Sequence, residues 1–230
     1  MTRWIGRAGI LFALWVSPSA AANELRNALD ASLASGDPQQ LVAIMRDHQN
    51  PADQVQIVRW LKDKVDTGQA PDKFAQVMVL QSLSEKNIPD AAMYLSYYRA
   101  LVWIDSSICP DPSSGASLLE GTIFLFGRLS HAPSLTEDQK RSAVDRALKL
   151  EETTSAVRKI DSSLCGAGLT GYAKDLNLTL SAPKGYDAIT AAPSTGLYKD
   201  DPVWIKKRRE IILPQLQATL LSLIGVQSSP

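Results

Sequence analysis

One six-residue phrase occurs twice in this chain, and each copy ends in a cysteine. Residues 104–109 read Ile-Asp-Ser-Ser-Ile-Cys, residues 160–165 read Ile-Asp-Ser-Ser-Leu-Cys, and the chain has no cysteine besides Cys109 and Cys165. In an exported chain, two cysteines in matched settings predict one structural disulfide. Redox-active thiols and metal ligation are the alternatives, and neither a Cys-x-x-Cys motif nor a neighbouring histidine supports them.

The first 22 residues are organised like a signal peptide. Arg3 and Arg7 precede an apolar run over residues 8–16, and the alanines at 20–22 offer a small-residue cleavage site before Asn23. The apolar run is about half of the roughly 20 residues that a membrane-spanning helix needs. We therefore expect residues 1–22 to be removed and the mature protein to reside in the periplasm or outside the cell.

The charge of the chain excludes a broad nucleic-acid-binding surface. The whole sequence has 24 basic and 24 acidic residues, so removal of Arg3 and Arg7 with the signal peptide leaves a formal charge near −2. A nucleic-acid-binding domain of this size carries a clear basic excess. The length fits one domain with an ample core.

Helix signals dominate the mature sequence. N-cap residues followed by proline occur at Asp37-Pro38, Asn50-Pro51 and Asp201-Pro202, and residues 136–139 have the spacing of a capping box. Ile88-Pro89 is a proline start without a cap. Apolar residues recur at steps of three and four, and no segment alternates like a strand. The sequence therefore predicts an all-α fold of antiparallel helical hairpins, either repeat-like or an irregular bundle, with one disulfide.

The expected helices place both cysteines at helix ends. Cys109 falls at the end of the fifth expected helix, and Cys165 at the end of the seventh, a long polar helix over residues 143–160 expected on the outside. If consecutive helices alternate in direction, the fifth and the seventh end at the same face of the protein. The disulfide is then expected from the topology.

Four segments are expected. Residues 1–22 are the signal peptide, 23–180 a helical domain, 181–201 a loop rich in Pro and Gly, and 202–230 a C-terminal helix that Pro214 should kink or break. The basic run at 206–209 is followed by an uncharged C-terminal segment, and this pattern suggests that the helix could interact with a membrane. The one-sided apolar stripe favours docking of this helix on the same domain.

Catalytic motifs are missing from the sequence. His48 and His131, the only histidines, lie near expected helix ends, and no metalloprotease, nucleophile-elbow, phosphate-loop or haem-attachment motif is present. The carboxylate pair Glu151-Glu152 is expected on an exposed helix face. We therefore expect no cofactor, no metal and no enzymatic activity.

Three groups of residues are candidates for contact with a partner. An aromatic cluster could line a groove, although core packing is the default for such residues. Two aspartates oppose the helix dipole at the ends of the cysteine-bearing helices, where they could bind a cation or a basic partner. The basic run could contact an acidic partner. The members are Tyr94, Tyr97, Tyr98 and Trp103; Asp105 and Asp161; and Lys206, Lys207, Arg208 and Arg209.

Residues 74–104 contain two apolar-faced helices on either side of Asn87-Ile88-Pro89-Asp90. With Ala91, Ala92, Tyr94, Tyr98 and Ala100 in the second helix, this stretch resembles one helix-turn-helix unit of the tetratricopeptide or Sel1-like repeats. The resemblance implies a scaffold that holds a peptide or partner protein in a concave groove. It implies no catalytic residues.

The leading hypothesis is an exported helical binding or adaptor protein that recognises a protein or peptide. An inhibitor or immunity-type protein that neutralises a secreted enzyme is the first alternative. An enzyme with an unfamiliar site near Asp105, Asp161 and the 181–201 loop is the second. The sequence leaves the oligomeric state and the partner open.

Overall fold

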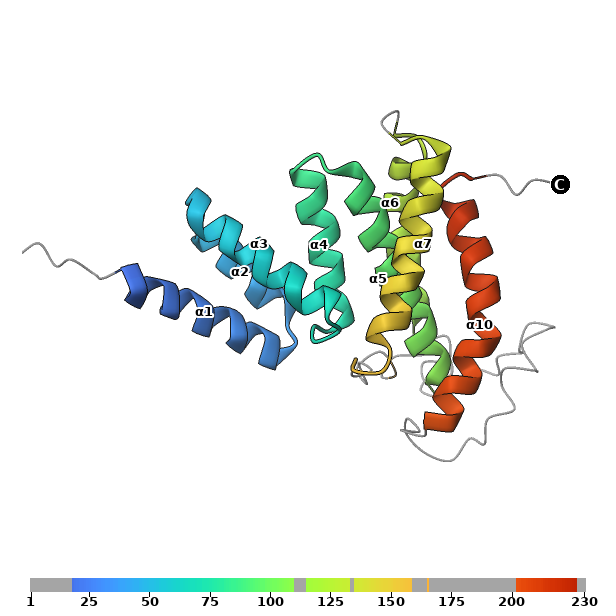
Figure 1. Cartoon of the computed structure of the whole chain (residues 1–230), viewed down its shortest axis with the longest axis horizontal. Coiled ribbons are helices and arrows are strands. Elements are labelled where there is room, and N and C mark those ends of the chain that lie inside the picture. The colour runs from blue at the N-terminus through green and yellow to red at the C-terminus, as the bar shows by residue number, and fades with distance from the viewer. Residues whose placement is uncertain (1–17, 110–114, 133–134, 159–164, 166–201, 227–230) are drawn as a thin grey trace, which may run out of the picture.

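The computed structural model describes residues 18–109, 115–132, 135–158, 165 and 202–226 (Figure 1). These residues form helices and no strand, which confirms the all-α prediction. The helices are α1 (Pro18–Ser35), α2 (Pro38–Asp47), α3 (Pro51–Asp66), α4 (Asp72–Ser84), α5 (Ile88–Ile108), α6 (Ala116–Ser130), α7 (Glu137–Thr154) and α10 (Pro202–Leu223).

The caps expected at Asp37, Asn50 and Thr136 are found, whereas Asp201 lies outside the described residues. The side chain of Asp37 accepts a hydrogen bond from the backbone N–H of Gln39, and that of Asn50 accepts one from Asp53. Thr136 and Gln139 form the complete capping box at the start of α7. The start of α5 is capped after all, because the Asn87 side chain accepts a hydrogen bond from the N–H of Asp90.

Helix α5 lies at the centre of the molecule. It contacts α4, α6, α7 and α10, and nearly all of its side chains are buried. A helix covered on all sides has no face toward solvent, which explains why apolar residues occur all round α5, and its polar residues Ser96, Arg99 and Asp105 are themselves buried. Gly115 permits the close approach of α6, because a Cβ atom there would lie 2.5 Å from the Cβ of Ser106.

Helices α5 and α7 run parallel with a fixed register. The pairs Asp90–Arg146, Tyr97–Thr154, Asp105–Arg158 and Cys109–Cys165 are separated by 56, 57, 53 and 56 residues. The two cysteine phrases are also 56 residues apart, so the sequence repeat coincides with the structural register. The expectation that the cysteine-bearing segments end at one face of the protein is confirmed.

The boundaries of α7 differ from the expectation. The helix ends at Thr154, not near residue 160, so Cys165 lies beyond its end. The expected outside position was also wrong, because Ala143, Val144 and Ala147 are buried against α5. Short alanine and valine side chains on one stripe of a charged helix allow this close packing.

Helix α10 closes the bundle. Ile212, Leu216, Leu220 and Ile224 are buried, and the helix contacts α5, α6 and α7. It runs antiparallel to α7, because Arg209 pairs with Glu151 and Gln217 with Asp145. Pro214 is exposed within the helix and does not end it.

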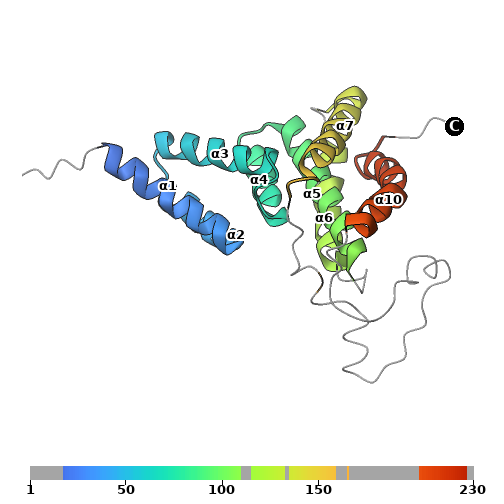
Figure 2. The ribbon, with the colours of Figure 1, turned by 60° about the horizontal axis from the view of Figure 1, so that its bottom comes forward.

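The N-terminal helices extend to one side of this bundle (Figure 2). Helix α3 is tied to α1 by a hydrogen bond from Trp60 Nε1 to Asp30 Oδ1 at 3.0 Å. Helix α1 begins at Pro18, inside the expected signal peptide, and its buried side chains include Leu25 and Leu29. Both leucines belong to the part of α1 that would remain after cleavage.

None of the described helices combines the length and the hydrophobicity needed to cross a membrane. The predicted loop at 181–201 lies outside the described residues.

Candidate functional site

A buried guanidinium group links three elements beneath the disulfide. Only 4% of the Arg158 side chain is exposed, and its Nη1 lies 3.3 Å from Asp72 Oδ1. Its Nη2 donates to Asp105 Oδ1 at 2.9 Å, while Nη1 contacts the other Asp105 oxygen. Asp72 comes from α4 and Asp105 from α5, and both carboxylates are buried. Arg158 follows α7, so one side chain joins α4, α5 and the segment after α7.

Glu151 and Arg209 extend this cluster to α10. Arg209 Nη2 donates to Glu151 Oε2 at 2.6 Å, and Glu151 Oε1 lies 4.0 Å from Arg158 Nη2. Glu151 is fully buried, so the expectation that it lies on an exposed face was wrong. We refer to Asp72, Asp105, Glu151, Arg158 and Arg209 as the charge cluster.

The pKa values of the groups in the charge cluster depend on the neighbouring charges. Burial lowers the pKa of Arg158, but Asp72 and Asp105 outweigh that effect and raise it overall. Burial raises the pKa of Glu151, and Arg209 and then Arg158 oppose this rise. Removing Arg158 would therefore leave the Asp105 carboxylate in the interior without the guanidinium group that both of its oxygens contact.

The disulfide lies next to the cluster in sequence and in space. The Cys109–Cys165 bond has an S–S distance of 2.08 Å, with the two Cα atoms 5.1 Å apart. Cys109 follows Asp105 by one helical turn, and its Sγ lies 3.6 Å from the Asp105 carbonyl oxygen. The bond therefore anchors the segment after Arg158 to the end of α5 that carries Asp105.

This geometry suits a structural clamp better than acid–base chemistry. Each carboxylate contacts an arginine, and an arginine stays protonated throughout the physiological range. Within the described part of the chain, no group of three or more His, Cys, Asp or Glu side chains could hold a metal ion.

The tyrosines that were candidates for partner contact lie in the core. Tyr94, Tyr97 and Tyr98 are each 1% exposed. The Tyr94 hydroxyl donates to Asp66 Oδ1 at 3.0 Å, and the Tyr97 hydroxyl lies 3.0 Å from Thr154 Oγ1. Trp103 is only partly buried. The three tyrosines thus hold the helices together and do not line an exposed groove.

The charged candidates for partner contact also divide into buried and exposed residues. Asp105 is buried in the charge cluster and is not available to a cation from solvent, whereas Asp161 lies outside the described residues. In the basic run, Lys206 and Lys207 are exposed, Arg208 is buried and Arg209 pairs with Glu151. Of this run, only the two lysines remain exposed cations for an acidic partner.

Sequence reasoning missed Arg158 and Asp72 altogether. A signal for Arg158 was present, because Asp105 is a carboxylate in the last turn of a mostly apolar helix and requires a cation nearby. The 56-residue spacing of the cysteine phrases places that turn level with residues near 161, where Arg158 is a nearby arginine. No comparable sequence signal marks Asp72.

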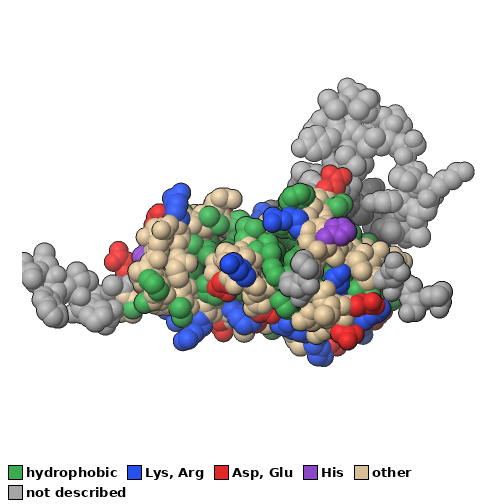
Figure 3. All heavy atoms as spheres, turned by 90° about the horizontal axis from the view of Figure 1, so that it is seen from above, with side chains coloured by type: hydrophobic (Ala, Val, Ile, Leu, Met, Phe, Trp, Pro, Cys, Tyr) green, Lys and Arg blue, Asp and Glu red, His purple; other side chains and the backbone are tan. Residues whose placement is uncertain are grey.

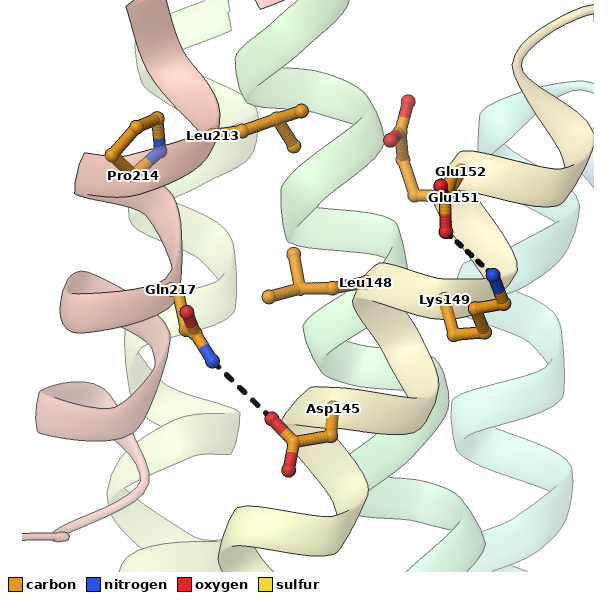
Figure 4. Close-up of a pocket in the computed structure, with 8 residues that line it drawn as sticks. All are labelled: Asp145, Leu148, Lys149, Glu151, Glu152, Leu213, Pro214 and Gln217. Carbon is orange, nitrogen blue, oxygen red and sulfur yellow. Dashed lines mark hydrogen bonds and ion pairs between the residues drawn. The ribbon is translucent and has the colours of Figure 1, made fainter. Parts of the chain in front are cut away.

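A shallow depression lies between α7 and α10 (Figure 4). Leu148 and Leu213 face each other across it, and Pro214 lies on the α10 side. The polar side chains at its rim are paired internally: Gln217 donates to Asp145 at 3.3 Å, and Lys149 pairs with Glu152 at 2.7 Å. This depression is a junction between two packed helices.

The more open apolar surface lies toward the N-terminal helices. Figure 3 shows hydrophobic side chains gathered in a hollow between the N-terminal helices and the bundle. Helices α2, α3 and α4 each expose one large hydrophobic side chain: Val42 is 42% exposed, Val55 60% and Leu80 51%. We refer to these three residues as the α2–α4 apolar set.

Comparison of the chain with protein-family models, with curated proteins and with solved structures found no match.

Proposed function

We propose that this protein is an exported α-helical binding or adaptor protein that recognises a protein or peptide partner through its N-terminal helices. The α2–α4 apolar set is the observation that carries this proposal. Contiguous exposed apolar side chains mark surfaces that other molecules cover, and α2 and α3, which carry two of the three residues, each contact α4. The hollow seen in Figure 3 adds a concave shape on the side of the molecule where α2–α4 lie.

The disulfide supports export, because such bonds persist in oxidising compartments and are rare in the cytosol. The charge cluster supports a scaffold role. Through Asp72 it fixes α4, one of the three helices of the proposed surface, to the bundle, and a rigid scaffold lowers the entropy cost of association.

The test is affinity purification of the tagged protein from its native cell envelope, followed by mass spectrometry. We expect a stoichiometric partner with the wild-type chain and its loss with the double variant Val55→Glu, Leu80→Glu. Ile211→Glu is the matched control, because Ile211 is also an exposed hydrophobic residue, 46% exposed, but lies on α10.

Capture of the same partner by all three proteins would contradict the proposed surface. A clean protein without partners would contradict the adaptor function itself. A very tight one-to-one complex with a secreted enzyme would instead identify an inhibitor or immunity-type protein.

A further inference from the structure

Helix α6 exposes one continuous face to solvent. Phe124 is 71% exposed and lies at the middle of this face. Glu120 and Gly121 are exposed on its N-terminal side, and Gly127 and Arg128 on its C-terminal side. We refer to these five residues as the α6 face. Residues 120, 124, 127 and 128 share one side of a helix because they are three or four positions apart.

The α6 face is symmetric about Phe124 in a way that suits self-association. The two glycines lie three positions before and three after Phe124, and the two charges lie four before and four after. The glycines are identical and the charges are opposite. Two copies of this helix related by a two-fold axis at Phe124 run antiparallel. Glu120 of each copy then lies opposite Arg128 of the other, and Gly121 lies opposite Gly127.

Both charges are available for such a contact. Glu120 and Arg128 make no hydrogen bond or ion pair with any residue in the described part of the chain. Phe124 has most of its ring in solvent, although α6 packs its opposite side against the core through Phe126 and Leu129. An exposed phenylalanine between two unpaired opposite charges is costly for a monomer and favourable at an interface.

The glycines remove the steric barrier to this pairing. A Cβ atom at Gly121 or at Gly127 would have no other atom within 4 Å, so nothing in the described part of the monomer occupies the space beside them. In a helix interior glycine is less favourable than alanine. Glycines on an exposed helical face let a second backbone come close, and the distance between packed helices depends on the side chains at the contact.

We propose that the α6 face is the interface of a symmetric homodimer. A two-fold axis requires a surface that is complementary to itself, and opposite charges at equal distances from a central aromatic residue fulfil that requirement. An interface with an unrelated protein would have no reason for this symmetry. The proposal is independent of the partner surface on α2–α4.

Charge reversal tests the pairing directly. Sedimentation velocity on the full disulfide-bonded chain is measured over a concentration series for the wild type, Glu120→Arg, Arg128→Glu and an equimolar mixture of the two variants. We expect the wild type to dimerise. Each variant alone should associate at least about tenfold more weakly, because two like-charge contacts replace two attractive ones.

The mixture is the decisive sample. The Glu120→Arg chain has arginine at both charged positions of the face, and the Arg128→Glu chain has glutamate at both. In a heterodimer of the two variants, each contact therefore joins an arginine to a glutamate, and association should return toward the wild-type level.

Lys206→Glu is the control variant. Its position is on α10, away from the α6 face, and the lysine side chain is 80% exposed, so this variant should dimerise like the wild type. A monomeric wild type, dimers insensitive to both reversals, or a mixture as weak as its components would each overturn the proposal.

Discussion

Arg158 shows how a single buried charge fixes this fold. Its guanidinium group lies between Asp72 and Asp105, with 4% of the side chain exposed. Such an arrangement gains little net free energy over an apolar core, because all three ions lose their hydration. Breaking it is costly, however, since the Asp105 carboxylate then stays buried without the guanidinium group that both of its oxygens contact. The contribution of Arg158 to stability is therefore measured best by removing it.

Arg158→Met should destabilise the protein by about 3–5 kcal/mol, because Asp72 and Asp105 lose their cation. Arg146→Met is the matched control. Arg146 also joins α5 and α7, through Asp90 at 2.9 Å, but its side chain is 50% exposed. We expect that control to lose at most about 1 kcal/mol. Urea unfolding at neutral pH measures both values, and equal losses would show that the cluster is not the stronger link.

Tyr97 makes the stability of the fold decrease with pH in the alkaline range. Burial raises the pKa of Tyr97 to about 12, above the value of about 10 for an exposed tyrosine. The unfolded chain therefore loses this proton first. The stability that the buried phenol contributes is complete below about pH 10 and is lost as the pH rises toward about 12.

Tyr97→Phe should remove this contribution. We expect a loss of about 1 kcal/mol at neutral pH from the missing hydrogen bond to Thr154. Between about pH 10 and about pH 12 the free energy of unfolding should fall less steeply than in the wild type, by up to about 1.4 kcal/mol per pH unit. Denaturant unfolding at several alkaline pH values gives both slopes. Parallel curves would show that Tyr97 ionises equally in both states.

At the level of elements, α5 and α7 form the axis to which the other helices attach. The pairs Asp90–Arg146 and Tyr97–Thr154 hold them in parallel register. The Asp105–Arg158 pair and the disulfide fasten the segment after α7 to the end of α5. The disulfide closes a loop with a sequence separation of 56 residues. The chain-entropy description assigns such a loop about 4 kcal/mol of stabilisation.

The disulfide and Arg158 should not act independently. We expect the double variant Cys109→Ser, Cys165→Ser to lose a few kcal/mol and stay folded. Adding Arg158→Met should cost less than it does in the wild type, because the segment after α7 is then no longer anchored at Cys165. Adding Arg146→Met should be additive within about 0.5 kcal/mol. A double-mutant cycle by urea unfolding measures both couplings. Additivity in both cases would show that the disulfide and the charge cluster contribute independently to stability.

At the scale of the whole molecule, α10 completes a core that the preceding helices leave open. It packs against α5, α6 and α7 although a long segment separates it from them in sequence. Leu216, Leu220 and Ile224 are fully buried. Contacts between distant segments must form before the core can close, which makes the last helix essential to the folded state.

Truncation after Gln215 should therefore abolish recovery of soluble protein, because it removes Leu216, Leu220 and Ile224 from the core. Leu220→Ala is a milder comparison that should cost about 2–5 kcal/mol and remain folded. Soluble yield and melting temperature measure both. A truncated chain with normal solubility and melting would mean that α10 is peripheral.

Local signals explain how much of the fold was predictable. The starts of α2, α3 and α7 were found from Asp37, Asn50 and Thr136, because a cap is decided by residues a few positions apart. The end of α7 was missed. Residues 155–160 carry no strong stop signal, and the chain leaves the helix after Thr154 at the point where Arg158 enters the buried cluster.

The sequence by itself determined an all-helical chain, its main helix starts and the pairing of its two cysteines, since these depend on local patterns and on a unique pair of residues. Only the tertiary structure decided which polar residues are inside. Glu151 is buried while its neighbour Glu152 is exposed, and three tyrosines of α5 lie in the core although they occupy more than one face of the helix. The cause is physical: the cost of burying a charge depends on opposite charges brought from distant parts of the chain.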